Sequence, residues 1–426
     1  MTVYRSFLKS ARNRPVAAAL FTASLASLLP VSYGATFDKV VMARNSVTVG
    51  GKKVHFGSFE AAAMNDKGQV SFYSVIYGAG VNVTNNNAIF TRKNKRTTLI
   101  ARENVATEIA GQTVTLTPLT TNFLINAGNR TLWSGDTNGN TNYYISTKGG
   151  AASPLVTITG TTAGNEPVAD FNSKNAISVL ALNLSLSTSP LTVFRISATQ
   201  ISSVVSAGSP AVGMPFGSTF QSFGNPSIDN KNTVYYTASI SGKGSKYDGI
   251  WQGKGADPKP IVVIGRNAPG VSGDFTAFTG SPAPSPNGKY CAFGADASTK
   301  SGIWLSTPAT GGIRKIAAEG QKVSTENGSV TLKTFDEPAV NNTGHVAFLA
   351  RAKTSAGTKS VLFLSESAGG ELKKVVGQGD TVLIGGKSLK INDILFKPRG
   401  GLNKKGKLLV TLAFTDRTSG IFIVTP

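Results

Sequence analysis

The sequence predicts an all-β protein in which seven similar sheets form a closed ring. Three observations carry this prediction: the composition, a motif that recurs seven times, and one strand that stands at the wrong end of the chain. The 426 residues include 47 Gly and only 15% charged residues, with abundant Thr, Ser and Asn. A chain this long needs several cores or a repeat architecture, and its composition favours strands and turns over helices.

Residues 1–34 have the pattern of a secretory signal peptide. A basic start is followed by the apolar run 16–29 and then by small residues. An N-terminal membrane anchor is the alternative, but the apolar run is short for a span and ends at Pro30. We therefore expect cleavage near Gly34 or Ala35, no membrane span in the mature chain, and a periplasmic or extracellular location. The basic residues of this segment are Arg5, Lys9, Arg12 and Arg14.

A strand–turn–strand motif opens each repeat. A short extended run ends in a polar turn, and an apolar strand follows. The fourth turn position is always Gly or Asn, the residues that most easily take the positive φ of a tight hairpin. These positions are Gly68, Asn129, Asn175, Asn232, Gly288, Gly344 and Gly406.

Two further strands follow the motif in each repeat, and their copy number predicts the topology. The third strand is present seven times, for example at 249–251, but the β-branched fourth strand only six times after it. The missing copy stands near the N-terminus, at 39–45. A closed ring explains the displacement, because the N-terminal strand then completes the last sheet. We predict a single domain, residues 35–426, folded as a seven-bladed β-propeller with four-stranded blades. An open β-solenoid is the alternative.

Three stretches resemble known repeats. Residues 284–320 are similar to the blade repeat of TolB-type propellers. The segments NDKGQVSF (65–72) and NNTGHVAF (341–348) resemble bacterial exported tandem-repeat proteins named for an NxxGxxAF motif. The resemblance implies a propeller scaffold. It carries no catalytic residue across, because these motifs specify the scaffold and not a chemistry.

Residues that could perform catalysis or bind a metal are scarce. The two histidines, His55 and His345, have no nearby cysteine, and the single cysteine, Cys291, lies in an apolar strand where we expect it to be buried. Asp136 opens a stretch with Asn at alternate positions, loosely like a calcium loop but with one carboxylate only. The acidic pair at 336–337 precedes an innermost strand and could face the channel. We expect no metal and no cofactor.

The basic residues are unevenly distributed, and the predicted topology gathers some of them. Turns between first and second strands and turns between third and fourth strands emerge on one face of a propeller. Blades 7 and 1 are neighbours in a closed ring, so their cationic turns should share that face. The alternative is that these are ordinary solubilising lysines. The candidate binding residues are Arg92, Lys93, Lys95, Arg96, Lys404, Lys405 and Lys407.

The formal charge of +21, or +17 without the four cations of the first segment, favours an acidic partner. We expect a secreted or periplasmic, non-enzymatic and monomeric scaffold that contacts an anionic polysaccharide or other envelope polyanion. Few aromatic residues lie among the basic runs, so specific nucleic-acid binding is not expected. The alternatives are an extracellular enzyme acting on carbohydrates or phosphoesters through carboxylates at the channel mouth, and a purely adhesive surface protein.

Overall fold

The computed structural model describes residues 34–116, 119, 123–137, 140–146, 152–158, 169–181, 190–242, 245–255, 257–367 and 369–426. The predicted signal peptide lies almost entirely outside these residues and stays a prediction. Every regular element in the described ranges is a β-strand, and no helix there is long and apolar enough to cross a membrane.

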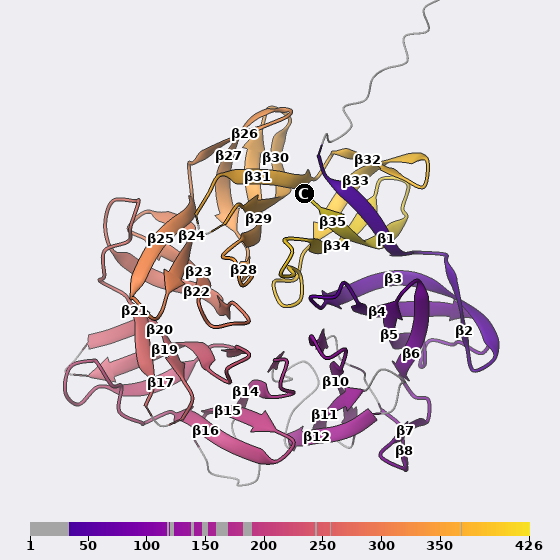
Figure 1. The fold of residues 1–426 in the computed structure, drawn as a ribbon, viewed down its shortest axis with the longest axis horizontal. Coiled ribbons are helices and arrows are strands. Elements are labelled where there is room, and N and C mark those ends of the chain that lie inside the picture. Colours follow the sequence, from indigo (N-terminus) through magenta and orange to yellow (C-terminus); the bar gives the residue numbers. More distant parts are fainter. Residues whose placement is uncertain are drawn as a thin grey trace, which may run out of the picture. The chain divides into compact units, whose positions relative to one another are not determined.

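Seven mostly antiparallel sheets are arranged around a central axis, as predicted (Figure 1). We number them blades 1 to 7 in chain order. Blade 1 contains β2 (Ser46–Val49), β3 (Lys52–Met64), β4 (Val70–Gly78), β5 (Asn87–Lys93) and β6 (Arg96–Arg102). Blade 2 contains β7 (Thr107–Ile109), β8 (Gln112–Val114), β9 (Leu124–Ile125), β10 (Thr131–Thr137), β11 (Asn140–Ser146) and β12 (Ala152–Ile158). Blade 3 contains β13 (Asp170–Phe171), β14 (Ile177–Ala181), β15 (Thr192–Ser197) and β16 (Gln200–Ser206).

The second half of the ring repeats this plan. Blade 4 contains β17 (Thr219–Phe223), β18 (Ser227–Ile228), β19 (Val234–Gly242), β20 (Ser245–Gly253) and β21 (Lys259–Val263). Blade 5 contains β22 (Phe275–Pro284), β23 (Cys291–Ala297), β24 (Lys300–Thr307) and β25 (Gly312–Ala318). Blade 6 contains β26 (Lys322–Thr325), β27 (Gly328–Phe335), β28 (Ala339–Val340), β29 (Val346–Thr354), β30 (Gly357–Ser365) and β31 (Leu372–Gly377). Blade 7 contains β32 (Thr381–Ile384), β33 (Lys387–Leu395), β34 (Leu408–Phe414), β35 (Ser419–Thr425) and β1 (Thr36–Met42).

The N-terminal strand closes the ring, which confirms the prediction made from the displaced copy. β1 pairs antiparallel with β35, from Thr36 opposite Thr425 to Met42 opposite Gly420. A register shift between Lys39 and Val41 lets two successive residues, Val40 and Val41, be buried. Blade 7 is therefore built from both ends of the propeller sequence.

Each blade has the four predicted strands, and four blades carry additional ones. In blades 1, 6 and 7 a short strand forms a hairpin with the first strand; these strands are β2, β26 and β32. In blade 2 the β7–β8 hairpin attaches to the outermost strand, β12. The first strand is interrupted in blades 4 and 6, where two segments pair with the same second strand. The additions extend the blades and leave the ring order unchanged.

Aromatic pairs on neighbouring strands fill the blades. Phe72 on β4 stacks on Phe90 on β5 with ring centroids 5.5 Å apart, and Phe348 on β29 stacks on Phe363 on β30 at 5.8 Å. Trp133 and Tyr144 do the same in blade 2 at 4.6 Å. Such pairs stabilise a sheet beyond their burial alone. The buried clusters that contain them extend between neighbouring blades, so the blades share their cores around the ring.

Candidate functional site

The seven turns between first and second strands have the backbone that the sequence predicts. The fourth turn residue has a positive φ in every copy, from 63° at Asn175 and Asn232 to 85° at Gly344. In most copies an Asn at the first position shapes the turn with its side chain. Asn172 Oδ1 accepts the N–H groups of Lys174 at 2.9 Å and Ala176 at 3.0 Å. These hydrogen bonds lie within one turn, so the asparagine shapes its own loop independently of the neighbouring blades.

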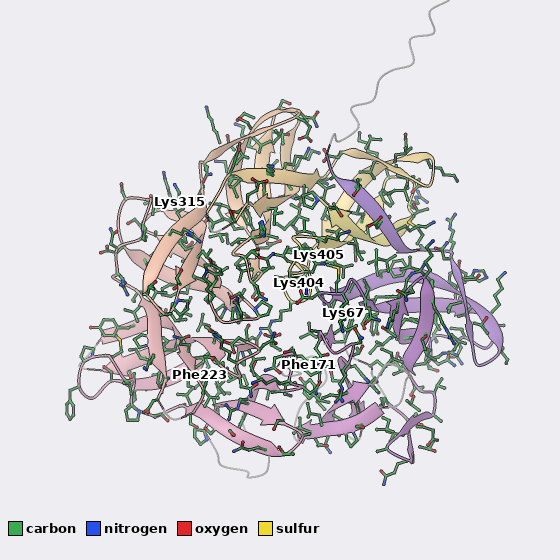
Figure 2. The ribbon with its side chains drawn as sticks, viewed as in Figure 1. Lys67, Phe171, Phe223, Lys315, Lys404 and Lys405 are labelled. Carbon is green, nitrogen blue, oxygen red and sulfur yellow. The ribbon has the colours of Figure 1, made fainter. Side chains whose placement is uncertain are left out.

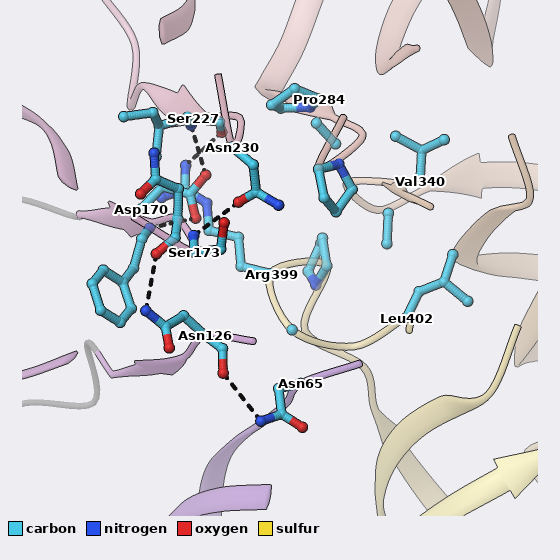
Figure 3. A pocket seen from close by; sticks show the side chains of 18 of the residues that line it. Asn65, Asn126, Asp170, Ser173, Ser227, Asn230, Pro284, Val340, Arg399 and Leu402 are labelled. Carbon is cyan, nitrogen blue, oxygen red and sulfur yellow. Dashed lines mark hydrogen bonds between the residues drawn. The ribbon is translucent and has the colours of Figure 1, made fainter. Parts of the chain in front are cut away.

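The same asparagines connect neighbouring blades. Asn65 Nδ2 donates to the Asn126 carbonyl at 3.0 Å, as Figure 3 shows, and Asn126 Nδ2 donates to the Asn172 carbonyl at 3.1 Å. Asn172 Nδ2 donates to the Asp229 carbonyl at 2.8 Å. The remaining four interfaces are bridged by Asn230 N to Pro286 O, Asn287 N to Asn342 Oδ1, Asn341 Nδ2 to Asn403 O, and Lys404 N to Asp66 Oδ1.

A hydrogen bond between turns therefore crosses every interface of the ring, including the one between blades 7 and 1. We call these seven turns the axial turns: residues 65–69, 126–130, 172–176, 229–233, 285–289, 341–345 and 403–407. They encircle the central channel together with the first strands that precede them. The recurring asparagine is thus both a turn former and a bridge between blades.

The predicted cations of blade 7 lie on its axial turn. Lys404 and Lys405 are exposed, and the Lys404 N–H donates to Asp66 Oδ1 of blade 1 at 2.8 Å. Lys407 is half-buried, with Nζ 3.7 Å from Asp38 Oδ2 on the closing strand. The side chains of Lys404 and Lys405 lie near the middle of the ring, beside Lys67 of blade 1 (Figure 2).

The predicted cations of blade 1 lie in the β5–β6 turn, further from the axis. Arg92 pairs with Val70, the first residue after the axial turn of the same blade, so both turns emerge at one edge. Its guanidinium is half-buried and donates to Thr97 Oγ1 at 3.0 Å, and burial lowers the pKa of Arg92. Lys95 and Arg96 are exposed and Lys93 is half-buried. The two predicted sets therefore share a face but lie at different distances from the axis.

The lysines at the end of the third-to-fourth turn of blade 6 are paired with acids. Lys373 forms an ion pair with Glu366. The Lys374 ammonium is buried and contacts Glu326 Oε1 at 3.0 Å and Asp380 Oδ1 at 2.8 Å. Burial alone would lower the pKa of Lys374, but the hydrogen bonds from these two carboxylates raise it overall. The charges of both lysines are thus paired with carboxylates and offer little to a ligand.

Arg399 crosses the central channel. The cavity measures about 160 Å³ and is lined by all seven blades. Arg399, in the loop before the axial turn of blade 7, donates from Nη2 to Pro226 O at 3.0 Å and Ser227 Oγ at 3.2 Å in blade 4 (Figure 3). The guanidinium therefore ties together blades that are not neighbours in the ring.

Within the described residues, three carboxylates line the channel, those of Asp66, Asp170 and Glu337, and each accepts a backbone N–H from a neighbouring blade. Asp170 Oδ2 accepts the N–H of Ile228 in blade 4 at 2.8 Å, and Glu337 Oε1 accepts the N–H of Ser281 in blade 5 at 2.8 Å. The carboxyl of Asp336, next to Glu337, is partly desolvated; this desolvation and the charge of Glu337 raise its pKa, and Arg351 opposes the shift. Of the predicted acidic pair, only Glu337 lines the channel, and one of its oxygens makes a hydrogen bond between blades 6 and 5.

The other candidate residues have structural surroundings. Cys291 is buried as expected, and burial raises the pKa of its thiol. His55 stacks on Tyr77 with centroids 5.4 Å apart. Asp136 Oδ1 accepts the Thr141 hydroxyl at 2.9 Å across the β10–β11 hairpin; Asn138 of the calcium-like stretch lies outside the described residues. Within the described ranges, no three His, Cys, Asp or Glu side chains gather as a metal site would require.

Comparison with known sequences places the chain in a family. The family model matches residues 31–185 and 115–426. The chain belongs to a family of unknown function, DUF7453. No curated protein matches it in sequence.

Solved structures similar to the DUF7453 chain are propellers. Oligogalacturonate lyase from Vibrio parahaemolyticus is 10% identical, with 91% of this chain and 98% of that chain covered and a TM-score of 0.51. The β-propeller domain of the Trilobed protease from Pyrococcus furiosus is 10% identical, with 86% and 95% covered and a TM-score of 0.50. TolB from Acinetobacter baumannii is also among them, at 13% identity and a TM-score of 0.36. The alignment covers 67% of the DUF7453 chain and 60% of TolB. At these identities the likeness shows the fold alone.

Proposed function

We propose that this DUF7453 protein is an exported, non-enzymatic scaffold that binds an anionic polysaccharide or a similar envelope polyanion through the face carrying the axial turns. The observation that supports the proposal most directly is the adjacency of the axial turns of blades 7 and 1. It places Lys404 and Lys405 on the same face as the β5–β6 turn of blade 1. The signal-peptide pattern supports export.

The charges on this face favour an extended anionic ligand. Lys95, Arg96, Lys404 and Lys405 are exposed, and no ion pair within the described residues involves them. Solvated charges of this kind attract a polyanion over a range of about 10 Å and lose strength as salt rises. A polymer with repeated carboxylates or sulfates can contact several of them at once, and multivalency then compensates for weak single contacts.

Retention on immobilised heparin tests the proposal. We expect the purified protein to be retained at low ionic strength and the K95Q/R96Q/K404Q/K405Q variant to elute at clearly lower salt. The matched control is K52Q/K53Q/K322Q/K387Q. It removes the same charge from exposed positions on the β2–β3, β26–β27 and β32–β33 hairpins. If both variants elute alike, net charge alone explains the retention. A protein that flows through at low salt has no polyanion-binding function of this kind.

A further inference from the structure

The axial turns carry a basic residue in every blade. Aligned on the first residue of each turn, the third or fifth position is always Lys, Arg or His. Seven of these fourteen positions are Lys or Arg, whereas 43 of all 426 residues are, which is about one in ten. The residues are Lys67, Arg130, Lys174, Lys231, Lys289, His345, Lys405 and Lys407.

The turn geometry directs these side chains outward. In blades 1, 3 and 7 the first-position Asn accepts the N–H groups of the third and fifth residues, so both backbones are held at the tip of the loop. Lys67, Lys174, Lys231 and Lys405 are exposed, as is Lys404 beside them. Figure 2 shows Lys67, Lys404 and Lys405 close to the middle of the ring. The hydrogen bonds between turns fix the spacing of the cations around the mouth of the channel.

Acidic residues do little to neutralise this ring. Asp66 and Asp229 are the acids of the axial turns. Asp66 accepts the Lys404 N–H, while Asp229 is buried and accepts the N–H groups of Lys231 and Thr233. In the described residues, Lys407 is the axial-turn cation that has an ion pair, with Asp38 on the closing strand. Within the described residues, the exposed lysines of the axial turns therefore have no ion-pair partner.

We infer that the cationic ring of the axial turns is the centre of the binding surface and that an anionic polysaccharide chain lies across the channel mouth. This inference rests on the proposed function and locates its site; the β5–β6 turn of blade 1 becomes a peripheral contact. The ring is mostly Lys, which presents a point charge without the planar fork that Arg uses for bidentate contacts. It therefore matches a ligand that repeats its charge along a flexible chain rather than one phosphate group of fixed geometry.

The ring offers little to nucleic-acid bases. Tyr290, which follows the axial turn of blade 5, is buried, and Lys289 Nζ lies 5.1 Å from its ring centroid. No axial turn contains Phe, Trp or Tyr. Stacking on aromatic side chains supplies much of the affinity for single strands, so this surface favours a polysaccharide over a nucleic acid.

Two triple variants distinguish binding at the axial turns from binding at the β5–β6 turn. K67Q/K174Q/K231Q removes exposed lysines from three axial turns, and K93Q/K95Q/R96Q removes three cations from the β5–β6 turn. Binding of labelled heparin and polygalacturonate is measured by fluorescence anisotropy at about 50 mM salt. We expect the axial variant to lose affinity for both polymers about ten-fold or more, and the other variant to lose at most about three-fold.

Further measurements make each outcome decisive. K67R/K174R/K231R should retain affinity. The thermal unfolding of all variants should match that of the wild type, because every substituted side chain except the half-buried Lys93 is exposed and no ion pair within the described residues involves any of them. Equal losses from the two triple-Gln variants would overturn the axial ring and leave the polyanion function standing. A wild-type protein that binds neither polymer would overturn the proposed function itself. Tighter binding of a short duplex DNA than of either polysaccharide would refute the ligand class.

Discussion

Replacing Asn172 with Ala should lower the free energy of unfolding by about 3 kcal/mol, the sum expected when several buried hydrogen bonds are lost together. Asn172 is 3% exposed and makes four bonds of 3.0 Å or less. Two hold its own turn, and two reach the Asp229 carbonyl and Asn232 Oδ1 of blade 4. Alanine leaves the turn N–H groups and the blade 4 acceptors without these bonds at a position where the asparagine is almost fully buried. Urea unfolding followed by tryptophan fluorescence measures the loss.

Two companion variants show which bonds matter. Asn327→Ala removes an exposed asparagine from the β26–β27 turn and should change stability by no more than about 0.5 kcal/mol. Asn172→Ser should be intermediate, because Ser285 at the equivalent position of blade 5 accepts one backbone N–H, that of Tyr290 just after the turn, at 2.9 Å. A serine hydroxyl is too short to reach the next blade as the amide does. If Asn172→Ala behaves like Asn327→Ala, the bridges between blades contribute nothing to stability.

The parts of the fold that the sequence predicts are those with a local cause. A positive φ at the fourth turn position favours Gly or Asn, so Gly68 or Asn129 indicates a turn from the local sequence alone. The closing strand is predictable because the copies of each strand can be counted in the sequence: the fourth strand has six copies after the third strands and one near the N-terminus. Residues 39–45 match the fourth strand of other blades, and only a ring gives such a strand a partner.

The bridges between blades have no local signature. An Asn that shapes its own turn explains the motif fully, so nothing in the sequence reveals that Asn65 Nδ2 also bonds the next blade. Arg399 reaches residues more than 170 positions away in blade 4, and its sequence neighbours show no trace of that contact. Such contacts depend on where the closed ring places side chains across the channel.

The cationic ring could have been found from the sequence. The Gly or Asn at the fourth position makes the seven turns recognisable, and the third and fifth positions carry the basic residues. A short segment with four cations, such as residues 92–96, is conspicuous in a linear sequence, whereas single residues such as Lys174 or Lys231 become a cluster only around an axis. The predicted binding residues therefore include the β5–β6 turn and the lysines of blade 7, but none of the axial-turn lysines of the other blades.

Replacing Val41 with Asp should detach the closing strand and destabilise the protein by about 4 kcal/mol, the range expected for a carboxylate forced into an apolar site. Val41 is 1% exposed and lies opposite Ile421 of β35. β1 is the first strand of the propeller, so it can leave without unfolding another strand. Its release would leave β35 as an unpaired edge and open the ring between blades 7 and 1. Thermal unfolding and hydrogen exchange measure the two consequences.

The site of faster exchange distinguishes loss of closure from general destabilisation. In the Val41→Asp protein, amides of β35 that bond to β1 should exchange first, while those of β24 in blade 5 keep their protection until global unfolding. Lys39→Asp places the same residue on an exposed position of the same strand and should leave exchange in β35 unchanged. Uniform acceleration in all blades would mean that the ring unfolds as one unit. β1 would then be an ordinary strand of a cooperative fold rather than a separable closure.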